Sequence, residues 1–150
     1  MEVTRLPNET AAHSGFNYKV VLTHADLTET TADTDQTIQV ASAGIGAIVR
    51  NAATFLKTDF QDASDSALND TAIIVGDGND TDRYILLQQV NTNGTEVDAA
   101  ISPSTGTLPY VYTTADSIDV VVASMSLKSL SNIDTGEVWV FLDLVETSEL

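Results

Sequence analysis

The 150-residue sequence has no cysteine and few basic residues, and each shortage excludes a class of protein. Without cysteine there is no disulfide, thiol nucleophile, iron–sulfur cluster or thiolate zinc site. Binding to phosphate needs clustered Lys and Arg, and we therefore expect no nucleic acid and no membrane as partner. Against 22 acidic residues and a net charge of −16, the basic residues are only six and scattered: Arg5, Lys19, Arg50, Lys57, Arg83 and Lys128.

Long apolar runs are also missing. Residues Met1 to Pro7 lack the apolar centre of a secretory signal, and no window reaches the roughly 18 apolar residues of a membrane-spanning helix. We expect a soluble protein that is made and assembled inside a cell. Val, Ile, Leu and Phe nevertheless total 41 residues, enough for a single domain with its own core.

The residues that are abundant favour strands. The chain has 20 Thr, 12 Ser and 15 Asp, and its apolar residues come in short runs rich in Val and Ile. We predict an all-β, single-domain antiparallel β-sandwich resembling a jelly roll. The predicted strands are Tyr18 to Thr23, Gln36 to Ser42, Ile48 to Thr58, Ala72 to Gly76, Tyr84 to Val90, Val97 to Ile101, Tyr110 to Thr113, Ser117 to Leu127 and Glu137 to Val145.

Two segments fit this scheme less well. Residues Ala43 to Leu56 also have apolar residues at helical spacing, but their β-branched content and the preceding glycines favour a long strand. The stretch Glu2 to Gly15 is polar and has no periodicity. We therefore divide the chain into an N-terminal arm or flexible segment over residues 1–16 and a β-sandwich domain over residues 17–150.

The last predicted strand is apolar on both faces. One face carries Val138, Val140, Leu142 and Leu144, and the other carries Trp139, Phe141 and Val145. Such a strand has to be covered twice, by the opposing sheet and by something else such as a neighbouring subunit. This pattern favours a role in protein interaction or structure.

The motifs of enzyme chemistry are not found. His13 and His24 are eleven residues apart and read as solvated loop residues, there is no Gly-x-Ser-x-Gly elbow, and Gly44-Ile45-Gly46 lacks the rest of a dinucleotide or P-loop fingerprint. We therefore expect no enzyme, no cofactor, and no catalytic, cofactor-binding or metal-binding residues.

Two loops are weaker candidates for binding. The run Asp77 to Asp82 has alternate oxygen donors that suit Ca²⁺, but it fails the EF-hand pattern and reads better as a plain solvated turn. Tyr110 and Tyr112 flank the loop Ser102 to Leu108 and are candidates for stacking on a sugar, although tyrosines packed at a sheet edge are the more frequent arrangement.

Several turn-and-strand motifs occur between Tyr18 and Val145: Val21 to Thr28, Asp35 to Ile38, Val75 to Gly78, Thr81 to Tyr84, Tyr112 to Val120 and Thr135 to Val138. Taken together, these motifs resemble those of the capsid decoration, or cement, proteins of tailed bacteriophages.

The resemblance implies a virion structural protein on the capsid outer surface, assembled in the host cytoplasm. Its partners would be the major capsid protein, whose subunits it bridges and stabilises, and two further copies of itself in a homotrimer. No catalytic residue comes with this family. The alternative function is a receptor- or carbohydrate-binding β module of a phage tail fibre, with its site at Tyr110, Tyr112 and the Ser102 to Leu108 loop.

Overall fold

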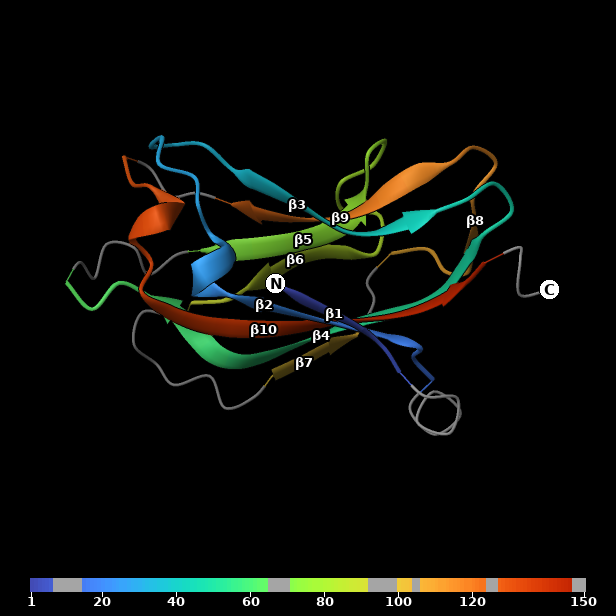
Figure 1. Cartoon of the computed structure of the whole chain (residues 1–150), viewed down its shortest axis with the longest axis horizontal. Helices are drawn as coiled ribbons and strands as arrows, with labels where there is room; N and C mark the ends of the chain where they lie inside the picture. The colour runs from blue at the N-terminus through green and yellow to red at the C-terminus, as the bar shows by residue number, and fades with distance from the viewer. Residues whose placement is uncertain (7–14, 65–70, 92–99, 104–105, 124–126, 147–150) are drawn as a thin grey trace.

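The computed structural model describes residues 1–6, 15–64, 71–91, 100–103, 106–123 and 127–146. In these residues two antiparallel sheets lie one above the other and form a β-sandwich (Figure 1). No described segment is a helix long and apolar enough to cross a membrane. The predicted all-β, single-domain sandwich is therefore confirmed.

Each sheet has a continuous order of hydrogen-bonded strands. The six-stranded sheet runs in the order β1 (Glu2–Arg5), β2 (Tyr18–Thr23), β10 (Thr135–Val145), β4 (Ile48–Gln61) and β7 (Ala100–Pro103), with β8 (Tyr110–Val111) also paired to β4. The four-stranded sheet runs in the order β3 (Gln36–Ala43), β9 (Asp116–Ala123), β5 (Ala72–Asp77) and β6 (Ile85–Gln89). Two short 3-10 helices, η1 (His24–Asp26) and η3 (Leu130–Asn132), lie in the connections.

The path of the chain is that of a jelly roll. Strands β2, β4, the β7–β8 pair and β10 belong to one sheet, and β3, the β5–β6 hairpin and β9 belong to the other, so the chain alternates between sheets. β7 and β8 pair with different stretches of β4, residues 53–56 and 48–49, and thus act as two pieces of one strand. This order confirms the jelly-roll prediction.

The core lies between the two sheets and is mainly aliphatic. Val138, Val140, Leu142 and Leu144 on β10 are at most 1% exposed and face Ile118, Val120 and Val122 of β9 across the sandwich. Burial of each such side chain contributes roughly 1.5–3 kcal/mol relative to leaving it in water. The alternating residues of β10 therefore form a buried inner face, as the sequence predicts.

The N-terminal residues and the ambiguous segment could be tested at several points. Residues Ile48–Gln61 form the strand β4 and not a helix, as we predicted. Glu2–Arg5 forms β1, which pairs with β2 and was not among the predicted strands. The division into an arm and a domain stays a prediction, and residues 97–99 and 124–126 of two predicted strands lie outside the described residues.

Candidate functional site

Aromatic side chains lie in a row on the outside of the six-stranded sheet. The register places Trp139 of β10 opposite Phe55 of β4, and their ring centroids are 5.2 Å apart. Phe141 follows on the same face, 6.2 Å from Trp139, and Phe16 lies 5.6 Å from Phe141. We call Phe16, Phe55, Trp139 and Phe141 the outer aromatic strip.

This position is unusual for the largest apolar side chains of the protein. The chain has four phenylalanines and one tryptophan, yet among them only Phe60 belongs to the buried core. The four rings of the outer aromatic strip are half-buried. Phe and Trp normally dominate a core, and their enrichment on a surface is typical of interfaces between proteins.

Phe16 joins the strip through the side chain of its neighbour Asn17. The Asn17 side chain donates a hydrogen bond from Nδ2 to the backbone carbonyl oxygen of Leu144 (2.6 Å). Its Oδ1 accepts a hydrogen bond from the backbone N–H of the same leucine (2.8 Å). These two bonds extend the pairing between β2 and β10 by one step. Phe16 is thereby held against the face of β10.

Trp139 is surrounded by charged groups from three strands. The Lys19 ammonium lies 3.3 Å from the centroid of the indole ring, in cation–π geometry. Below the ring, Glu137 accepts hydrogen bonds from Trp139 Nε1 (2.6 Å) and from Lys57 Nζ (3.0 Å to Oε2). The hydrogen bond from Trp139, followed by that from Lys57, holds the pKa of Glu137 below its usual value.

A second ion pair lies on the same face at the other end of β10. Arg50 lies at a bulge in β4, where the register with β10 shifts, and its Nε is 2.8 Å from Asp143 Oδ2. Hydrogen bonding to Asp143 raises the pKa of Arg50 further. Together with Lys19 and Lys57, this places three of the six basic residues beside the outer aromatic strip. The face is therefore much less acidic than the chain as a whole.

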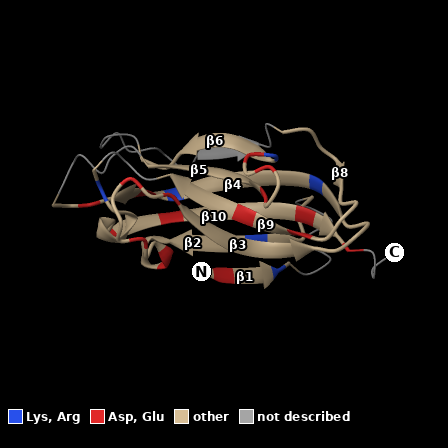
Figure 2. Ribbon diagram, turned by 90° about the horizontal axis from the view of Figure 1, so that it is seen from above, with Lys and Arg blue, Asp and Glu red and all other residues tan. Residues whose placement is uncertain are grey.

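The outside of the four-stranded sheet is different. Its four strands contain no Lys or Arg and only three acidic residues, Asp77, Asp116 and Asp119, and Figure 2 draws most of their length in tan. Leu87 on β6 is 60% exposed. This surface has no row of aromatic rings among the described residues and serves below as the comparison face.

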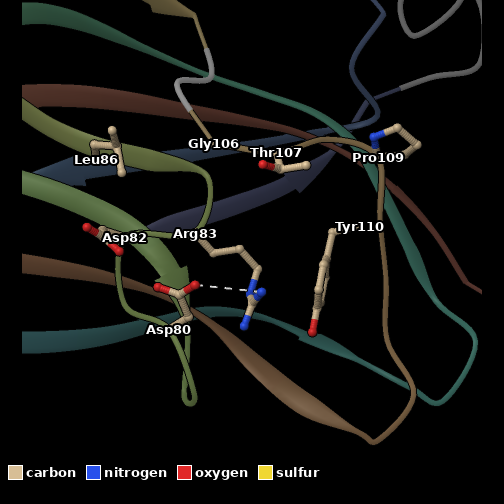
Figure 3. Close-up of a pocket in the computed structure, with 8 residues that line it drawn as sticks. All are labelled: Asp80, Asp82, Arg83, Leu86, Gly106, Thr107, Pro109 and Tyr110. Carbon is tan, nitrogen blue, oxygen red and sulfur yellow. Dashed lines mark ion pairs between the residues drawn. The ribbon is translucent and has the colours of Figure 1, made fainter.

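A pocket of about 480 Å³ opens at the corner where β6 and β8 approach each other. Its floor is Arg83, whose guanidinium carbon lies 4.0 Å from the centroid of the Tyr110 ring (Figure 3). The remaining lining residues are Asp80, Asp82, Leu86, Gly106, Thr107 and Pro109.

The predicted cation loop forms part of this corner, and its first carboxylate already has partners. Asp77 is 1% exposed; its Oδ1 accepts from the N–H groups of Asn79 (3.0 Å) and Asp80 (2.9 Å). Its Oδ2 accepts from Arg83 Nε at 2.5 Å. With an arginine at the carboxylate, the loop does not present Asp77 to a cation, and no group of three metal-ligating side chains occurs in the described part of the chain.

The two predicted sugar-stacking tyrosines are not a platform. Tyr112 is 3% exposed, and its hydroxyl hydrogen-bonds with that of Tyr84 and donates to Asp77 Oδ2 (3.2 Å). Burial raises the pKa of both phenols. Tyr110 has Arg83 over its ring. Tyr112 is therefore packed, as the sequence favoured, and is not available for the sugar stacking that the tail-fibre alternative requires.

Of the two histidines, the structure describes only His24. His24 is half-buried in η1 and lines a shallow depression of about 340 Å³ with Thr23, Thr58, Thr135, Gly136 and Glu137. His13 lies outside the described residues.

Comparisons with known proteins show where the fold occurs elsewhere. No protein-family model and no curated protein sequence matches the chain. A chain of the Cyanophage Pam1 capsid asymmetric unit superposes with a TM-score of 0.56 and 19% identity, over 85% of this chain and 81% of its own. A chain of the acidic stable capsid structure of Helicobacter pylori bacteriophage KHP30 gives a TM-score of 0.49 and 11% identity, over 86% and 89%. The first similarity shows a shared fold.

Proposed function

We propose that this chain is a structural protein of a bacteriophage virion that decorates the outer surface of the capsid. In this role it bridges subunits of the major capsid protein as a homotrimer and stabilises the shell. The observation that carries the proposal is its fold, which it shares over 85% of its length with a chain of the Cyanophage Pam1 capsid asymmetric unit.

The surface of the molecule supports a role in protein contact. Its largest aromatic side chains lie on the outside of a sheet, where they are available to a protein partner. A trimer that binds at three equivalent sites gains avidity, so each copy needs only a modest contact with the shell. The acidic body, with a net charge of −16, disfavours attachment to the packaged DNA.

The tail-fibre alternative has less support from the geometry. Its two tyrosines do not form one stacking surface, because Tyr112 is buried in a hydrogen-bond network and the ring of Tyr110 is covered by the Arg83 guanidinium. We therefore retain capsid decoration as the proposal and use glycan binding as a competing outcome of its test.

The test uses capsids of the phage that encodes this chain, prepared without the protein by deletion of its gene. We expect purified chain to co-sediment with these capsids, to saturate at a fixed number of copies, and to raise their melting temperature. Binding to a glycan array, lost in Tyr110→Ala, without co-sedimentation with capsids would overturn the proposal. Mass measurement by light scattering tests the trimer, which has an expected mass of about 48 kDa, three times 15.9 kDa.

A further inference from the structure

We infer that the outer aromatic strip is the surface through which one copy of this chain docks on a second copy, with Trp139 and Lys19 at the centre of the contact. The inference rests on the proposed function because it names the partner of one face of the proposed trimer. It does not depend on which capsid subunit the trimer meets.

The shape and chemistry of the strip suit a protein partner. Three of its rings form a continuous series, with neighbouring centroids 5.2 Å and 6.2 Å apart from Phe55 through Trp139 to Phe141. All three project from paired strands of one sheet and are therefore held rigidly, so little side-chain freedom is lost on binding. Tryptophan in the centre of such a patch is a frequent hot spot of protein interfaces.

The charge around the strip favours a second copy as that partner. Lys19 lies over Trp139 and has no carboxylate within ion-pair distance among the described residues. Of the carboxylates on this face, Glu137 and Asp143 beside the strip are paired with Lys57 and Arg50, and Glu2 lies on the edge strand β1, opposite Val21. The centre of the strip thus offers positive charge to an approaching surface, and the other copies of a chain with net charge −16 are acidic surfaces that are always present.

Symmetry defines the kind of contact. In a ring of three copies, the same surface cannot meet itself, so the strip of each copy contacts a different surface of the next one. An acidic surface of the neighbour then meets Lys19. The four half-buried rings supply only part of the roughly 800 Å² per partner of a standard interface, so we expect dissociation to be measurable on dilution.

Trp139 is the only tryptophan and reports directly on this contact. The full chain is diluted from high to low micromolar concentration while its mass is followed by light scattering, and its fluorescence is measured with acrylamide as quencher. We expect the loss of mass on dilution to coincide with a red shift of the emission and an increase of about twofold or more in the quenching constant.

Two variants compare the two outer faces. Lys19→Glu keeps the rings but reverses the charge over Trp139, and we expect it to weaken self-association by about tenfold or more, with a smaller effect at high salt. Leu87→Ser changes an exposed apolar residue on the other sheet and should leave the association unchanged. Circular dichroism confirms that each variant is folded before its association is measured.

Three results would overturn the inference. One is association that leaves the quenching of Trp139 unchanged, and another is association that Lys19→Glu does not affect. The third is a chain that stays monomeric but whose Trp139 becomes protected when capsids are added, since the strip would then be a capsid contact. In that last case the proposed function still stands, whereas self-association through the strip without capsid binding would refute the function and leave the inference intact.

Discussion

Replacing Asp77 with asparagine tests a buried carboxylate that accepts hydrogen bonds from four residues. An amide at this position can still accept hydrogen bonds from the N–H groups of Asn79 and Asp80, but its NH₂ group would face Arg83 Nε and the Tyr112 hydroxyl, which are donors to the carboxylate. Two donors then lose an acceptor, one of them charged. Because the Arg83 side chain is 20% exposed and can reach water, we expect a loss of about 2–4 kcal/mol in the free energy of unfolding, less than for a fully buried pair.

The assay is urea denaturation together with thermal melting of the parent and the variant. At this chain length a loss of that size corresponds to a decrease of about 5–15 °C in the melting temperature. Asp82→Asn is the matched control, because Asp82 lies in the same loop and its pKa is raised by a hydrogen bond with Asp80 and by the neighbouring negative charge. Removing that charge should leave the melting temperature unchanged or raise it. A variant Asp77→Asn as stable as the parent, or Asp82→Asn as damaging as Asp77→Asn, would refute the reasoning.

Two further predictions concern the start of β10. Gly136 has φ +139°, and a Cβ atom there would collide with the backbone and ring of Phe60. Gly136→Ala should therefore lower the free energy of unfolding, measured by urea denaturation, by about 2 kcal/mol or more. Gly44→Ala, which meets no close neighbour, should be tolerated and is the control. The second prediction concerns Glu137, whose pKa in the folded protein is below the usual 4.5. The ionised carboxylate therefore stabilises the fold at neutral pH, and this stabilisation is lost as the pH falls through the lowered pKa. We expect the emission of Trp139 to titrate with a midpoint below 4.5, and Glu137→Gln to abolish this transition.

The strands could be predicted from the sequence where a single alternation covers them, and less well elsewhere. β2 matches its prediction residue for residue, because Val20 and Leu22 alternate with partly exposed residues. β4 has register shifts against β10, which break the alternation and explain why its sequence also suggested a helix. β1 was missed because all its residues are exposed at a sheet edge and it carries no apolar alternation.

The candidate surface could be predicted only in part. The outward rings of β10, Trp139 and Phe141, follow from the two apolar faces of that strand. Phe55 joins them through the register between strands distant in sequence, and Phe16 through the side chain of Asn17, and neither relation is visible in a local pattern. The pairing of Asp77 with Arg83 was also missed, because it depends on how the turn between them closes.

The position of β10 has a consequence for synthesis. The last strand of the chain lies in the interior of the six-stranded sheet, between β2 and β4, so that sheet cannot close until residues Thr135–Val145 have left the ribosome. Until then β2 and β4 have no common neighbour, and a product that stops before Thr135 leaves both with open edges. A chain that stops before Thr135 therefore cannot complete the six-stranded sheet.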